Sequence, residues 1–106
     1  MALISTLTLA DNGTVSMKCK NNRVGASSTY TVIIYGTFGS GTITTKVSAD
    51  GVTYVNMIDD GSTVTFTSGA GENFQINSDE NQPVYLGFTL AGATNPAITI
   101  KIYDNK

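Results

Sequence analysis

Hydrophobic and polar residues alternate in short runs along the whole chain, and turn-forming residues separate the runs. Alternation with a period of two is typical of β-strands that bury one face, whereas helices need a sustained period near 3.6 residues. The separating residues are mostly Gly, Asn, Asp and Pro, whose backbone preferences suit tight turns. The expected strands are Leu3–Ala10, Thr14–Cys19, Thr29–Phe38, Thr42–Ala49, Val52–Ile58, Thr63–Thr67, Asn73–Ile76, Val84–Leu90 and Ala97–Tyr103.

This pattern predicts an all-β fold, an antiparallel β-sandwich or jelly roll of about eight or nine short strands. The 106 residues contain no linker, repeat or low-complexity tract. We therefore expect residues 1–106 to form a single all-β domain, which can bury about two-thirds of the surface of its unfolded chain.

The central region predicts a three-strand meander. If Gly39-Ser40 and Asp50-Gly51 are two-residue hairpin loops, Thr42–Ala49 pairs with both of its neighbours along the chain. Val47 then lies opposite Val32 on one side and opposite Tyr54 on the other. One face of the meander becomes apolar, as a buried sheet surface requires. Its members are Val32, Ile34, Ile43, Val47, Val52, Tyr54 and Ile58.

The other face of the meander is mixed and includes Ile33 and Tyr35. It is more apolar than a solvated face needs to be, so we expect a neighbouring subunit or the loop Lys20–Ser28 to cover part of it. Five apolar positions of the alternating runs are expected in the core: Ile34, Val47, Phe66, Phe88 and Ile100.

The low charge of the chain narrows the classes of partner. Charged residues make up 13% of the sequence, with six basic and eight acidic side chains and a net charge of −2. No stretch concentrates Lys or Arg, so we expect no nucleic-acid partner. No apolar run approaches the roughly 20 residues that span a bilayer, so we expect no membrane association. The single Cys19 and the absence of a signal-like start favour synthesis in a reducing cytoplasm.

The residues needed for catalysis or metal binding are scarce. The sequence has no His, which removes the commonest general base and metal ligand. Nearly all carboxylates fall in expected turns, including Asp59-Asp60-Gly61, and a glycosidase needs two that face each other across a cleft. The segment Asn77–Asn81 offers oxygen ligands but lacks the spacing and the Gly of an EF-hand loop. The sequence therefore predicts no enzyme, no cofactor and no metal site.

Exposed aromatic side chains are the usual sign of a sugar-binding sandwich. Tyr35 and Tyr85 could form such a platform, although the sequence contains no Trp. Packing in the core or at a subunit interface is the favoured interpretation of both residues.

Two segments resemble a pattern in small structural proteins of tailed bacteriophages. In Gly36–Val55 a strand ends in a Gly-rich turn, a Thr- and Val-rich strand follows, and Ser-x-Asp-Gly leads to an aromatic residue. That aromatic is often Trp in the pattern and is Tyr54 here. The segment Leu90–Ile102 resembles the end of such proteins. The resemblance implies a small β-sandwich component of the virion and supplies no catalytic residues.

The resulting hypothesis is a capsid decoration (cement) subunit that stabilises the head shell of a phage. Its partners would be the major capsid protein or other virion proteins, and it would occur as a homo-oligomer or in many copies on the virion, after synthesis in the host cytoplasm. The alternatives are a tail or neck subunit and a carbohydrate- or receptor-binding module. Chain ends and long loops reach neighbours most easily. The expected partner-binding residues are Met1, Ala2, Leu3, Ile4, Asn22, Arg23, Tyr35 and Tyr103.

Overall fold

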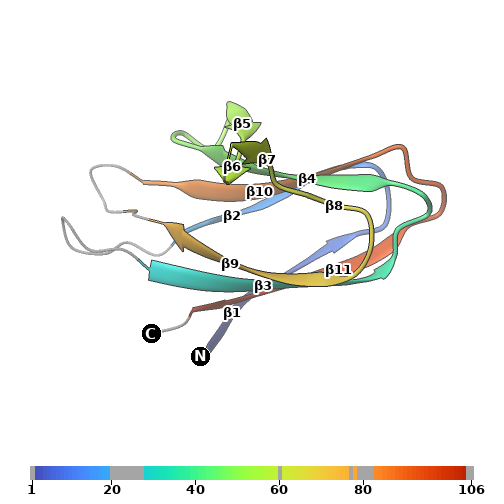
Figure 1. The fold of residues 1–106 in the computed structure, drawn as a ribbon, viewed down its shortest axis with the longest axis horizontal. Coiled ribbons are helices and arrows are strands. Elements are labelled where there is room, and N and C mark those ends of the chain that lie inside the picture. Colours follow the sequence, from blue (N-terminus) through green and yellow to red (C-terminus); the bar gives the residue numbers. More distant parts are fainter. Residues whose placement is uncertain (1, 20–27, 60, 77, 79–82, 105–106) are drawn as a thin grey trace.

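A computed structural model describes residues 2–19, 28–59, 61–76, 78 and 83–104 (Figure 1). Within these ranges the protein is all-β, with eleven strands and no helix. The strands are β1 (Ala2–Leu9), β2 (Gly13–Lys18), β3 (Ser28–Thr37), β4 (Thr42–Ser48), β5 (Tyr54–Asn56), β6 (Ile58–Asp59), β7 (Ser62–Thr63), β8 (Thr65–Phe66), β9 (Ala70–Ile76), β10 (Tyr85–Ala91) and β11 (Ala97–Asp104). The predicted fold class is confirmed, and six of the long strands begin and end within one residue of the expected positions. Strand β9 begins three residues earlier than expected, and the expected strands Val52–Ile58 and Thr63–Thr67 are each divided into two short ones.

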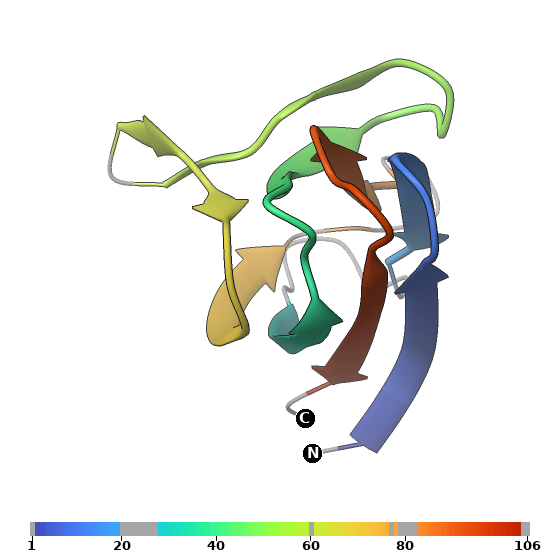
Figure 2. The same ribbon diagram turned by 90° about the vertical axis from the view of Figure 1, so that its right-hand side faces the viewer.

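The strands form two antiparallel sheets that stack face to face (Figures 1 and 2). The first sheet has the strand order β1-β11-β3-β9, and the second has the order β2-β10-β4-β5, with β8 also pairing with β4. The short strands β6 and β7 form a separate hairpin. The faces that point between the two sheets are largely apolar, so stacking removes most of this apolar surface from water.

The order of the strands is that of a jelly roll. The first two long strands, β1 and β2, pair with the last two, β11 and β10. On the other side of β11 and β10 lie β3 and β4, and these in turn pair with β9 and β8. Counting β5 and β8 as two parts of one strand gives the eight strands of two Greek keys. Of the two architectures expected from the sequence, the pairing therefore selects the jelly roll.

The core is filled by alternate residues of the long strands. In β11, three buried isoleucines alternate with Thr99, Lys101 and Tyr103, which lie on the outer face. The predicted core residues Ile34, Phe66, Phe88 and Ile100 are buried, and Val47 is half-buried against the core. The fully buried Tyr30 and Leu86 were not singled out in the sequence. Burial of this apolar surface is the main force that holds the two sheets together.

The predicted meander is wrong in its first pairing. Strand β3 lies in the first sheet and β4 in the second, so Val32 is not paired with Val47. The Gly39-Ser40 turn joins the two sheets rather than two neighbouring strands. Gly39 and Ser40 have φ angles of 59° and 67°, and the Gly41 N–H donates to the Phe38 carbonyl over 2.9 Å. Both strands bury one face in the same core, and their alternation is therefore the same as that of a hairpin.

The second predicted pairing exists with a different register. Strand β5 pairs with β4, but Val47 lies opposite Val55 and Ser48 lies opposite Tyr54. Residues 49–53 form the connection, which is longer than the expected two-residue loop. As a result, Val52 and Ile58 are 82% and 59% exposed, and their predicted place in the core is wrong.

The partner of β4 changes at Thr45. Lys46–Ser48 pair with β5, whereas Ile43 and Thr44 pair with β8. Between these two pairings the Thr45 N–H donates to the Val64 carbonyl, and the Met57 N–H donates to the Thr45 carbonyl, both over 2.9 Å. Between Met57 and Val64 of the chain, strands β6 and β7 form a hairpin outside this sheet, which projects at the left of Figure 2.

Candidate interaction surface

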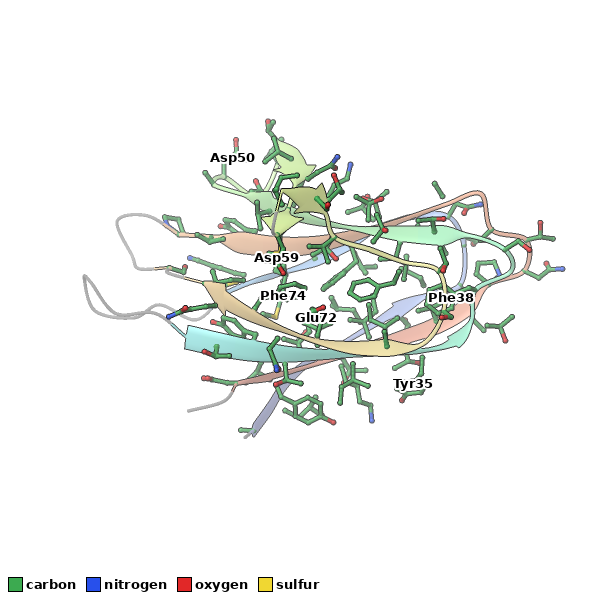
Figure 3. The ribbon with its side chains drawn as sticks, viewed as in Figure 1. Tyr35, Phe38, Asp50, Asp59, Glu72 and Phe74 are labelled. Atoms are coloured by element: carbon green, nitrogen blue, oxygen red, sulfur yellow. The ribbon has the colours of Figure 1, made fainter. Side chains whose placement is uncertain are left out.

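Three of the predicted partner-binding residues lie on one face of the protein. Leu3 is paired directly with Tyr103, and Tyr103 is paired with Thr31 of β3. Tyr35 lies further along β3, opposite Thr99. Because these positions alternate with buried residues of β3 and β11, their side chains point away from the core. Figure 3 shows Tyr35 projecting from the first sheet on the side away from the second.

We name this surface the outer patch and define it as Leu3, Thr31, Ile33, Tyr35, Thr99, Lys101 and Tyr103. Its apolar members are well exposed: Leu3 is 49%, Ile33 37% and Tyr35 45% exposed. Lys101 lies opposite Ile33 and is the one charged residue of the patch. Ile33 and Lys101 were not among the predicted contact residues, although Ile33 belongs to the mixed face for which a covering subunit was expected. The patch offers apolar and hydroxyl-bearing contacts with little charge.

The described contact residues expected at the N-terminus lie in the first sheet. Ala2 pairs with Asp104 and Leu3 pairs with Tyr103, so both belong to strand β1. Ile4 lies where the register shifts between Leu3 and Ser5, and it is 42% exposed. The backbone of Ala2–Ile4 is therefore held by pairing with β11, and contact of these residues with a partner stays a prediction. Met1, Asn22 and Arg23 lie outside the described residues.

The two tyrosines considered for a sugar platform lie on opposite sides of the sandwich. Tyr85 is on the outer face of the second sheet, next to Lys18, whose Nζ is 6.0 Å from the ring centroid. Its other neighbours are Ser48 and, beyond it, Tyr54. Tyr35 is on the outer face of the first sheet. A shared platform of Tyr35 and Tyr85 is therefore excluded by the fold.

The connection between β4 and β5 is held in one conformation by two side chains. The Ser48 hydroxyl accepts hydrogen bonds from the N–H groups of Asp50 and Gly51, at 3.2 and 2.9 Å. The Asp50 carboxylate accepts from the N–H groups of Val52 and Thr53, both at 2.8 Å, and from the Ser48 hydroxyl at 3.0 Å. These bonds, led by the one from Thr53, lower the pKa of Asp50. The carboxylate of Asp50 therefore stabilises the conformation of the loop through these hydrogen bonds.

A cavity of about 430 Å³ adjoins this loop. Its described lining residues are Val47, Ser48, Ala49, Asp50, Thr53, Val55 and Val84. The lining is mostly apolar, and of its polar side chains Ser48 and Asp50 already bond to each other and to the backbone. Within the described ranges, no three His, Cys, Asp or Glu side chains gather as a metal site would require.

The other residues that could take part in chemistry, Cys19 and Ser78, are buried and hydrogen-bonded within the domain. Cys19 is buried, and burial raises the pKa of its thiol to about 11, partly offset by a hydrogen bond with Tyr30. Ser78, in the segment considered for calcium, is buried and accepts a hydrogen bond from the Val84 N–H at 2.9 Å. The neighbouring residues 77 and 79–81 lie outside the described ranges. No described helix is long and apolar enough to cross a membrane.

Comparisons with known proteins return no match, whether with family models, curated proteins or solved structures. The fold and the chemistry of the described surfaces therefore carry the evidence for function. Among these surfaces, the outer patch combines several predicted contact residues on the face of one continuous sheet.

Proposed function

We propose that this protein is a structural subunit of a phage virion, a capsid decoration (cement) protein that stabilises the head shell. The observation that carries the proposal is the outer patch, which places Leu3, Tyr35 and Tyr103 on one sheet face with a single charge, Lys101. Its partner would be the major capsid protein or another virion protein. The resemblance of Gly36–Val55 and Leu90–Ile102 to phage structural proteins supports the same assignment.

A decoration subunit strengthens a shell by burying surface and needs no reaction chemistry. A typical stable interface buries about 800 Å² on each partner, and aromatic residues contribute strongly to such interfaces. The first sheet can present a patch of this kind without distortion because all four of its strands are paired to their neighbours and its inner face is packed on the core. Many copies on a symmetric shell multiply the effect through simultaneous contacts.

The chemistry of the patch predicts how binding responds to salt. Salt weakens attraction between exposed charges and has little effect on apolar contact. With Lys101 as its one charge, the patch should bind shells with an affinity that changes less than about threefold between low and moderate salt. A tail or neck subunit would use the same physics, so the location of binding separates these possibilities.

The test measures occupancy on purified particles that lack this protein. The patch variant Ile33→Thr/Tyr35→Thr removes two exposed apolar side chains and keeps residues suited to a strand. We expect its affinity for heads to fall by at least about tenfold, since truncating a hot-spot residue at the centre of an interface costs about 2 kcal/mol or more and Tyr is enriched among hot spots. The matched control is Val52→Thr, which removes a more exposed apolar side chain from a loop of the other sheet. We expect this control to bind within about twofold of the wild type.

Three results would contradict the proposal. An equal loss in Val52→Thr would remove the outer patch from the interface. A collapse of occupancy at moderate salt would show that charges dominate. Binding to tails, or to glycans on a glycan array, instead of heads would favour the alternative functions.

A further inference from the structure

The two sides of the sandwich differ in how their strand edges are covered. On one side lie β9 and the divided strand β5–β8, and the chain itself projects from that side as the β6–β7 hairpin. On the other side lie β1 and β2, the edge strands of the first and second sheet. Figure 2 shows β1, in blue, at the right-hand margin of the first sheet, with no described segment beyond it.

The β1 edge carries few of the features that usually prevent edge strands from pairing with other chains. Natural edge strands carry charged residues, Pro or bulges, or are very short. Strand β1 is eight residues long, and its sequence ALISTLTL has neither a charge nor a Pro. Its one register shift lies between Leu3 and Ser5, which leaves Thr6–Leu9 regular. The other long edge strands each contain a charge, Lys18 in β2 and Glu72 in β9.

The same side also leaves core-facing residues partly open to solvent. Leu7 of β1, together with Val15 and Met17 of β2, packs against the core but is only half-buried. These three apolar side chains lie along the line where the two sheets part. A second molecule on this side would therefore cover apolar surface as well as an unpaired strand edge.

We propose that two copies of this chain form a dimer about a twofold axis, in which the two β1 strands pair antiparallel. A twofold axis perpendicular to the first sheet makes β1 antiparallel to its own copy and joins two four-stranded sheets into one. The uncharged edge suits this partner because like charges placed opposite each other would destabilise a self-pair. The side that carries β1 and β2 belongs to a molecule of 42 × 28 × 24 Å and runs along the longest axis. Such a side has room for the roughly 800 Å² per partner of a standard interface.

This symmetry has two structural consequences. The assembly closes at two copies, because each dimer uses both β1 edges. Both outer patches face the same way, since a perpendicular twofold axis preserves the direction of each sheet face. The dimer could therefore bind a shell through two patches at once, but its existence does not depend on the proposed function.

The test measures mass by sedimentation equilibrium over a wide range of protein concentration. We expect the wild type to approach twice the chain mass of 11.1 kDa as concentration rises. The variant Thr6→Lys/Thr8→Lys places two charges on exposed positions of β1 and should weaken dimerisation by at least about tenfold. The matched control Thr29→Lys/Thr37→Lys adds the same charge at exposed positions of the central strand β3, and should stay within about threefold of wild type.

A second measurement needs no variant. Amide hydrogen exchange of the wild type should slow in β1 as concentration rises through the dimer range, whereas exchange in β9 should stay constant. Edge pairing together with apolar burial should give a dimer with a dissociation constant below about 1 mM. A wild type that remains at 11.1 kDa up to about millimolar concentration would therefore overturn the proposal. The proposal would also be overturned by a mass above that of a dimer, or by equal weakening of dimerisation in the two lysine variants. An amide exchange rate in β1 that does not change with protein concentration would overturn it as well.

Discussion

Two adjacent isoleucines of β3 offer a direct test of which face of the first sheet is buried. Ile34 points between the sheets and is 1% exposed, whereas Ile33 points outward and is 37% exposed. Replacing each in turn by Ala removes the same atoms from neighbouring positions of one strand. The pair therefore separates the effect of burial from the effect of composition and strand propensity.

The expected magnitudes follow from these surroundings. Ile34→Ala removes buried methyl and methylene groups and leaves a cavity between the sheets, which costs about 2–5 kcal/mol. This is a large part of the roughly 5–15 kcal/mol that stabilises a small domain. Ile33→Ala leaves no internal cavity, and its cost should be about 1 kcal/mol or less, the range of strand propensity.

The assay is urea unfolding of the three proteins, followed by circular dichroism and fitted with a common slope. The free energy of unfolding should fall in the order wild type, Ile33→Ala, Ile34→Ala, with the larger step at the end. Equal losses for the two variants, or a larger loss for Ile33→Ala, would refute the assignment of faces and with it the position of the outer patch.

Three further predictions concern single side chains. The fully buried Thr45 hydroxyl has no hydrogen-bond partner among the described residues, so Thr45→Val should raise the free energy of unfolding in urea by about 1 kcal/mol, and a loss would contradict the stated burial. The Cys19 thiol, buried and with its pKa raised to about 11, should resist a thiol reagent at pH 8 in the native protein and react once urea is added; rapid native reaction would contradict this. The pKa of Asp50 is lower in the folded protein, so its contribution to stability is present above the unfolded-state pKa and is lost as pH falls through the folded-state pKa. Accordingly, wild type and Asp50→Asn should differ in melting temperature at neutral pH and converge in acid, and a constant difference would contradict the role of this carboxylate.

Alternation along the chain was sufficient to locate the core. Ile34, Phe88 and Ile100 were predicted to be buried from their positions in alternating runs, and the structure confirms all three. The extents of most long strands were also predictable, because Gly, Asn, Asp or Pro lies near at least one end of each; β9 is the exception, since it begins within the Gly-Ala-Gly segment that was expected to be a turn. These features depend on local sequence and on which face meets the core.

Strand neighbours were harder to predict, because alternation does not encode them. Two strands joined by a short turn show the same pattern whether they pair in one sheet or face each other across a core. The turn after Phe38 crosses between the sheets, and Gly36 lies where a Cβ would run into the Ala97 carbonyl of β11. Gly36, Gly39 and Gly41 therefore allow close packing at this end of the sandwich.

The length of the β4–β5 connection was also hidden from the sequence. Asp50-Gly51 resembles a two-residue hairpin loop, but the Ser48 and Asp50 side chains bond the backbone of a longer loop. This changed the register and exposed Val52. Side-chain bonding of this kind depends on loop geometry, and turn propensities do not reveal it.

The outer patch was only partly predictable. The positions of Leu3 and Tyr103 near the chain ends predict contact with a partner, and the fold pairs the two residues with each other. The unusually apolar second face of β3, with Ile33 and Tyr35, was the clearest signal in the sequence. The sequence did not reveal that β1 is an edge strand. That position depends on the pairing of β1 with β11 at the margin of the sheet, which local sequence does not encode.

The location of this chain on a purified virion tests the proposed function most directly. Electron cryo-microscopy of particles that carry the protein should show the jelly roll on the outside of the head shell, with the first sheet facing the capsid lattice. Tyr35 should then lie at the contact and Val52 away from it. Density in the tail or neck, the second sheet facing the shell, or particles without this chain would contradict the proposal.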